Sequence, residues 1–160
     1  MLIQAITFSV SIVFISFMVG MIMTALIKNT NFYKTKLSNL NFIKSDLLNQ
    51  IIGVGIVKWI VKYTFFKFLN PNLKFHKKTG IAEIKSIRND MTKAEVDHLF
   101  AFLFVSLFMF SAIYNQKFFL ALTLLLINIL MNLYPSLLQQ QNKRRIDKLL
   151  SKFEKRKEIN

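Results

Sequence analysis

Two ionisable residues near the middle of the chain have a spacing that could support proton transfer. Glu95 and His98 are three positions apart, so in a helix both side chains project from one face. A carboxylate placed there can orient an imidazole and raise its basicity, and such a histidine can act as a general base on a hydroxyl. The alternative is that His98 caps a membrane-spanning helix at the interface and that Glu95 is a solvated acid in its first turn. The spacing leaves both interpretations open.

A second group of polar residues lies at the end of the last long apolar run. Four amide side chains, residues 139–142, are followed by three basic residues, 143–145. Asn132 lies about two helical turns earlier, and Pro135 is expected to kink the helix because it lacks an amide hydrogen. Polar groups at membrane depth are costly and need partners, so they are candidates for function. A basic cluster beside a membrane can also serve only as an anchor.

The elements that would position these residues are three long apolar segments. Residues 1–27 contain no charged side chain and are long enough to cross a hydrocarbon core of about 30 Å. This segment lacks the basic start and the small-residue cleavage site of a secretory signal, so we expect a retained anchor. Residues 96–114 and 118–138 are separated by three residues, which forces an antiparallel transmembrane hairpin. The sequence therefore predicts an all-α membrane protein with about three transmembrane helices.

Two further segments have the pattern of amphipathic helices. Apolar and aromatic residues recur at helical spacing over residues 47–69, with lysines on another face and with Trp59 and Tyr63 placed to lie at headgroup level. We expect this helix to lie in the membrane interface, although a re-entrant or spanning arrangement stays open. The basic tail, residues 142–158, places apolar side chains on one helical face in the same way. These helices complete one predicted membrane domain over residues 1–160.

The distribution of charge predicts the orientation in the membrane. Residues 28–95 carry 13 Lys and Arg against 4 acidic residues, and residues 143–160 carry 8 against 3, whereas the hairpin loop has only Lys117. Under the positive-inside rule, the central segment and the tail are cytoplasmic and the N-terminus is outside. Because the positive charge adjoins apolar segments, the net charge of +14 favours binding to anionic lipid headgroups and not to nucleic acid.

Several kinds of site are not expected from the composition. The chain has no cysteine and only two histidines, so we expect no disulfide, no thiolate chemistry and no multi-histidine metal centre. It contains no glycine-rich phosphate loop, no G-x-S-x-G elbow and no H-E-x-x-H motif. No cofactor and no metal are therefore expected.

Two short motifs resemble those of a known family. Ala94-Glu95-Val96-Asp97-His98 is similar to an A-E-x-x-H motif at the start of a span. The second motif resembles N-x-x-P followed by Q-x-x-N-x-x-R, and it uses Asn132, Pro135, Gln139, Asn142 and Arg145. Both motifs are typical of the glycosyl-4,4'-diaponeurosporenoate acyltransferase family, small bacterial membrane enzymes of carotenoid pathways. The resemblance covers about two thirds of the chain.

The chain also departs from the family pattern at several positions. Where the family typically has Q-R-Y-N-R, this chain reads Gln139-Gln140-Gln141-Asn142-Lys143, and Leu99 replaces a usual tryptophan. These differences leave the exact substrate open.

The resemblance implies transfer of a fatty acyl group onto a hydroxyl of a glycosylated carotenoid or a similar lipid-linked acceptor. Glu95 would orient His98, and His98 would act as the base. Asn142 and Arg145 would bind the acyl carbonyl, a phosphate of the donor, or both, with support from Asn132 and Gln139. The implied partners are a lipidic acyl donor, a glycolipid acceptor and anionic headgroups, and a homo-oligomer is compatible with the sequence. The implied location is the bacterial inner (cytoplasmic) membrane, crossed several times.

A different class of function stays open. A non-catalytic membrane subunit or adaptor would use the same basic interfacial helices to bind anionic lipid or a partner protein. An autonomous transporter is a weaker alternative, because three spans are too few to enclose a transport pathway without oligomerisation.

Overall fold

A computed structural model describes residues 2–43 and 80–159, together with Ser45, Leu47, Ile51, Gly53, Gly55, Trp59 and Tyr63. The described residues contain helices and no strand. They divide into two compact units, and each is described by itself. The first unit comprises residues 1–39 and 93–136, and the second unit comprises residues 40–92 and 137–160.

The regular elements follow one another along the chain as helices of different lengths. They are α1 (Leu2–Ile27), α2 (Asn31–Thr35), the 3-10 helix η1 (Leu37–Asn39), α5 (Ile81–Tyr114), α6 (Phe118–Asn128), the π-helical stretch η4 (Ile129–Leu133) and α7 (Tyr134–Ile159). Within the described residues, three helical stretches are long and apolar enough to cross a membrane: Leu2–Ile27, Ile81–Tyr114 and Phe118–Phe153. The prediction of an all-α membrane protein with about three spanning helices is confirmed.

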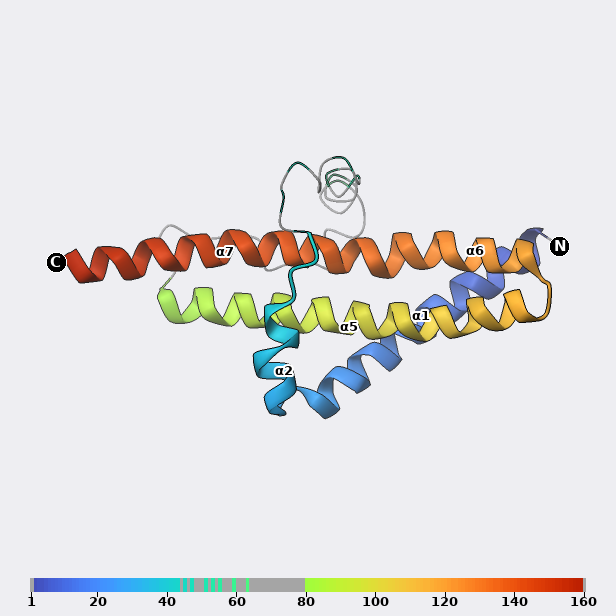
Figure 1. The fold of residues 1–160 in the computed structure, drawn as a ribbon, viewed down its shortest axis with the longest axis horizontal. Coiled ribbons are helices and arrows are strands. Elements are labelled where there is room, and N and C mark those ends of the chain that lie inside the picture. The colour runs from blue at the N-terminus through green and yellow to red at the C-terminus, as the bar shows by residue number, and fades with distance from the viewer. Residues whose placement is uncertain are drawn as a thin grey trace. The chain divides into compact units, whose positions relative to one another are not determined.

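The first unit contains the predicted hairpin. The end of α5 and the start of α6 run antiparallel and are joined by a tight turn (Figure 1). The amide of Lys117 donates to the carbonyl of Ala112 at 2.9 Å, and Gln116 takes a left-handed conformation with φ of 58°. Three residues suffice to reverse the chain because one of them adopts this conformation, which ends the helix.

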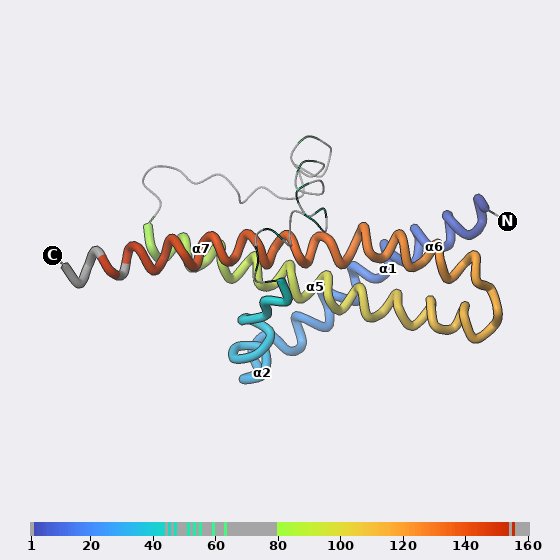
Figure 2. The backbone as a smooth tube through the Cα atoms, turned by 45° about the horizontal axis from the view of Figure 1, so that its top comes forward, coloured from blue at the N-terminus to red at the C-terminus, as the bar shows by residue number. Residues whose placement is uncertain are grey.

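Helix α1 runs obliquely along this hairpin (Figures 1 and 2). Its first turns lie beside the hairpin loop, since Ala5 and Phe8 line the same hollow as residues 116–120. Its later turns lie against the part of α5 that is farther from the hairpin loop, where Gly20 meets the backbone of Asp97. The N-terminal end of α1 and the hairpin loop therefore share one end of the first unit, as the predicted orientation requires. Which side of the membrane this end faces stays a prediction.

Small residues form the buried face of α1, and large apolar residues remain exposed. The buried residues of α1 are Ala5, Ser9, Val13, Ser16, Gly20 and Thr24. Phe14, Met18 and Leu26 are between 60% and 71% exposed. A soluble domain would bury the larger side chains, whereas helices in lipid gain little from doing so and pack through small residues instead. The burial pattern thus supports a membrane environment for the first unit.

A π-helical stretch lies directly before Pro135. The amide of Tyr134 donates to the carbonyl of Ile129, five residues earlier, in place of the usual spacing of four. The sequence predicts a kink at Pro135 because this residue cannot donate to the carbonyl of Met131. The structure shows the local adjustment as one extra residue in the turns that lead to the proline. This stretch contains Asn132.

The second unit shows a helical segment that the apolar runs did not indicate. Helix α5 begins at Ile81, well before the predicted span at residue 96. Ile84 and Met91 of this early part pack against Ile146 and Leu150 of α7. The apolar face of the tail, which the sequence analysis interpreted as interfacial, is therefore covered by another helix of the same unit. Arg88 and Asp147 add an ion pair between these helices, with Nε and Oδ1 2.5 Å apart.

The predicted helix over residues 47–69 lies largely outside the described residues. Six of its residues are described, and five of them are helical and exposed at intervals of four: Leu47, Ile51, Gly55, Trp59 and Tyr63. The rings of Trp59 and Tyr63 lie with their centroids 5.6 Å apart. The choice between an interfacial, a re-entrant and a spanning helix stays a prediction.

The close approach of α1 and α5 at Gly20 leads to a first prediction. A Cβ atom at position 20 would overlap the carbonyl oxygen of Asp97 and lie 3.0 Å from its carbonyl carbon. Gly20→Ala should therefore lower stability by about 1–3 kcal/mol, because backbone on the facing helix cannot move aside cheaply. The measurement is the melting temperature of the purified protein in detergent.

Gly80→Ala is the matched control, since a Cβ atom at position 80 meets nothing within 4 Å. A melting temperature for Gly20→Ala equal to that of the wild type would contradict the described contact between α1 and α5.

Candidate active site

The imidazole of His98 is half-buried and is contacted by residues of the first unit. His98 lies on α5, and the ring of Phe17 on α1 meets it edge to face, with centroids 5.6 Å apart and an interplanar angle of 89°. The side chain of Asn132 also interacts with the imidazole. Three helical elements thus contribute to the surroundings of one candidate base.

Asn132 is fully buried and is held by polar groups from two directions. Its amide nitrogen donates to Oδ1 of Asn128 at 2.8 Å and to Oγ of Ser16 at 3.3 Å. Asn128 is one turn earlier in α6, and its own amide nitrogen donates to the carbonyl of Phe102 on α5 at 3.0 Å. We call Ser16, His98, Asn128 and Asn132 the polar cluster. It links α1, α5 and α6 inside the candidate membrane region.

Two buried atoms of the polar cluster can each take part in a further hydrogen bond. Nδ1 of His98 and Oδ1 of Asn132 make no hydrogen bond of normal geometry within the described residues. Buried polar atoms are costly unless they are paired, so such atoms indicate either a bond formed between them or a ligand.

The predicted partner Glu95 is also in the first unit. Its side chain is 0% exposed. Glu95 lies in the interior of the α5 sequence, several turns after the start of that helix at Ile81. The alternative interpretation of Glu95 as a solvated acid in the first turn of a span is therefore wrong, and His98 is not a helix cap. The helix begins earlier because its first turns are stabilised by packing on α7.

Tyr33 is a candidate that the sequence analysis missed. Helix α2 is capped by Thr30, whose hydroxyl accepts the amide of Tyr33 at 3.2 Å. Burial raises the pKa of the Tyr33 hydroxyl, and the nearby carboxylates of Asp97 and Glu95 raise it further. Tyr33 therefore stays a neutral hydrogen-bond donor beside these acids. The only sequence signal is the capping threonine, which predicts a helix start and not a site.

The remaining predicted residues belong to the second unit. Gln139 and Asn142 are buried on α7, whereas Arg145 is exposed. The neighbouring Arg144 makes hydrogen bonds within the second unit. Its guanidinium donates to Oδ1 of Asn41 at 2.7 Å and to the carbonyl of Ile43. In the same way Gln140 accepts the amide of Phe42 at 2.9 Å. These contacts tie the segment after residue 40 to α7.

The residues thus fall into two sets. Glu95, His98 and Asn132 share the first unit, and Gln139, Asn142 and Arg145 share the second unit. Among the described residues, no group of three His, Asp or Glu side chains is arranged to hold a metal ion.

Comparison with known proteins decides the family. The sequence matches the family described as glycosyl-4,4'-diaponeurosporenoate acyltransferase over residues 28–152. The chain belongs to this family. No curated protein and no solved structure matches it. The family match includes every predicted site residue and Tyr33, and it begins after α1. The chain is thus a membrane protein of an acyltransferase family of carotenoid biosynthesis.

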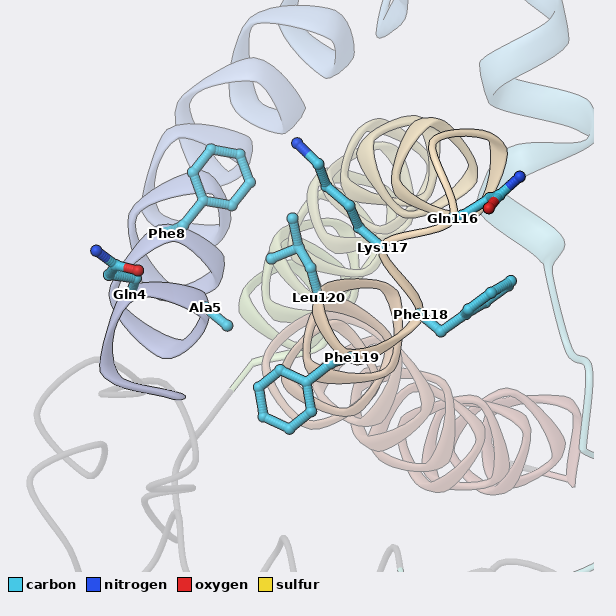
Figure 3. A pocket seen from close by; sticks show the side chains of 8 residues that line it. All are labelled: Gln4, Ala5, Phe8, Gln116, Lys117, Phe118, Phe119 and Leu120. Atoms are coloured by element: carbon cyan, nitrogen blue, oxygen red, sulfur yellow. The ribbon is translucent and has the colours of Figure 1, made fainter. Parts of the chain in front are cut away.

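A hollow of about 620 Å³ lies at the other end of the first unit of this family member. Figure 3 shows it between the first turns of α1 and the hairpin loop, with Gln4, Phe8, Lys117 and Phe119 among its lining side chains. It contains none of the predicted site residues. Its walls are largely apolar and carry no acid or histidine, and Lys117 is the one ionisable residue among the described residues that line it.

The different positions of Arg144 and Arg145 lead to a second prediction. Arg144→Gln should lower stability by roughly 1.5–3 kcal/mol, because it removes charge-assisted hydrogen bonds to Asn41 and Ile43. Arg145→Gln is the matched control and should change stability by less than about 0.5 kcal/mol, because its side chain is exposed. Melting temperatures in detergent test both values. Equal losses in the two variants would contradict the described role of Arg144.

Proposed function

We propose that this protein transfers a fatty acyl group onto a hydroxyl of a glycosylated carotenoid, or of a similar lipid-linked acceptor, at the cytoplasmic surface of a bacterial inner membrane. The family description names this class of acceptor and this type of reaction. The observation that carries the proposal is the half-buried imidazole of His98, which lies beside Asn132 and one helical turn from the buried Glu95.

The chemistry requires a base and an activated acyl donor, such as a thioester or an ester. His98 removes the proton of the acceptor hydroxyl while the oxygen bonds to the acyl carbonyl carbon. The bond from that carbon to the leaving group then breaks, and the imidazolium returns the proton to the leaving group. Glu95 stabilises the charged imidazolium during this cycle, and the neutral Tyr33 hydroxyl is a hydrogen-bond donor near the same carboxylates.

Substrate binding is assigned to polar residues predicted from the sequence. Asn142 and Arg145 bind the acyl carbonyl or a phosphate of the donor, and Gln139 supports them. The exposed guanidinium of Arg145 is suited to a planar, bidentate contact with a carboxylate or a phosphate. Both substrates are amphiphiles, so their tails stay in lipid while the reacting groups meet near headgroup depth.

The third prediction tests the assigned base and its partner. His98→Ala should lower the rate of acyl transfer by about 10² to 10⁴, because a positioned base is lost. Glu95→Gln should be milder, since the imidazole itself remains and only the negative charge that stabilises its protonated form is lost. The measurement is the conversion of a glycosylated carotenoid to its acylated product in membranes that contain each variant.

Two matched controls use the other histidine and an exposed acid of α5. His76→Ala and Asp90→Asn should keep wild-type activity, since neither residue is assigned to the site. Full activity in His98→Ala would reject the catalytic assignment. That result would favour the non-catalytic adaptor, which tolerates alanine at both Glu95 and His98.

A further inference from the structure

Two backbone carbonyls, one on α5 and one on α1, determine which end of the Asn132 amide faces which neighbour. An amide side chain presents an oxygen at one side and an NH2 group at the other, and its neighbours decide which faces where. A backbone carbonyl can only accept hydrogen bonds. The group that faces it must therefore be a donor, which fixes the orientation of the next group in the network.

The first carbonyl is that of Phe102 on α5. Asn128 must turn its NH2 group toward this carbonyl, and the distance from Nδ2 to the oxygen is 3.0 Å. Oδ1 of Asn128 then faces Asn132 as an acceptor. Asn132 must therefore donate from its own NH2 group, and its Nδ2 lies 2.8 Å from Oδ1 of Asn128. The reversed amide of Asn132 would place two carbonyl oxygens against each other.

The second carbonyl is that of Val13 on α1. The hydroxyl of Ser16 donates its single hydrogen to this carbonyl at 2.7 Å, so the oxygen of Ser16 is left as an acceptor. It accepts from Nδ2 of Asn132 at 3.3 Å. Both hydrogens of the Asn132 amide are thus used by Ser16 and Asn128. Oδ1 of Asn132 is left as an acceptor without a hydrogen bond to either of them.

A further neighbour of Asn132 is the imidazole of His98. The two side chains interact, and the buried ring nitrogen of His98 that lacks a hydrogen-bond partner is Nδ1. An acceptor oxygen can pair with a ring nitrogen only when that nitrogen carries a hydrogen. The edge-to-face contact with Phe17 limits rotation of the ring away from this position.

We propose that Ser16 and Asn128 are positioning residues that set the tautomer of His98. They hold the Asn132 amide so that its oxygen accepts from Nδ1–H of His98, and Nε2 keeps the lone pair that removes the proton. The catalytic part of this inference rests on the proposed function, whereas the tautomer does not. Ser16 lies on α1, outside residues 28–152, so this span contributes to the site as well as anchoring the chain.

The test measures the tautomer directly. The chain has two histidines, so ¹⁵N-histidine labelling with the His76→Ala variant leaves the ring of His98 as the only labelled side chain. At a pH where the ring is neutral, the wild-type cluster should show Nδ1 as the protonated nitrogen and Nε2 as the free one. Protonation at Nε2 instead would overturn the inference.

Variants then test whether the two positioning residues maintain this state. Asn128→Leu and Ser16→Ala should each give a mixture of tautomers and should lower kcat by about 3- to 10-fold with little change in KM. Ser9→Ala is the matched control, because Ser9 is equally buried on α1 and makes no hydrogen bond from its hydroxyl within the described residues. It should leave both the tautomer and kcat unchanged. Equal tautomer populations in all three variants and the wild type would also overturn the inference.

The outcome separates the inference from the proposed function. If His98 shows the expected tautomer but His98→Ala retains full activity, the inferred orientation stands and the catalytic role fails. If the tautomer is the opposite one and His98→Ala is inactive, the catalytic role stands and the positioning by Ser16 and Asn128 is rejected.

Discussion

The first unit depends on one constraint: a polar side chain buried among helices in lipid must find its partners inside the protein. Asn132 meets this constraint by donating to Ser16 on α1 and to Asn128 on α6, while Asn128 donates to the backbone of α5. The small residues of α1 and the π-helical stretch before Pro135 accompany the same contacts. Because lipid supplies no hydrophobic force between helices, hydrogen bonds and close packing together hold such elements in register.

The parts of the fold that could be predicted are those with a local signal. A charge-free run from Leu2 to Ile27 and two apolar runs separated by three residues specify spans and a hairpin through hydropathy and loop length alone. The family was recognisable from two short motifs for a similar reason, since each motif lies within one continuous stretch of the chain, residues 94–98 and 132–145. Glu95, His98 and Asn132 could therefore be named as candidates without knowledge of how the helices pack.

The parts that could not be predicted depend on partners far away in the sequence. The start of α5 contains charged residues between its apolar ones, and it is stabilised by Ile146 and Leu150 of α7, so no apolar run indicated it. Ser16 is a single small polar residue in an apolar span, and its role follows only from its contact with Asn132. Asn128 did have a signal, since it lies four residues before Asn132 and thus on the same face of a helix. Tyr33 became a candidate only because the fold brings the carboxylates of Asp97 and Glu95 near it.

The central claim is that the imidazole of His98 performs proton transfer and does not merely fill a buried position. Chemical rescue tests this claim most directly. His98→Ala should leave a space beside Phe17 and Asn132, and added imidazole should restore acyl transfer in a concentration-dependent and saturable way. The restored rate should follow the fraction of imidazole that is unprotonated. Recovery of protein stability by imidazole with no recovery of acyl transfer would contradict the account, because it would assign His98 a structural role alone.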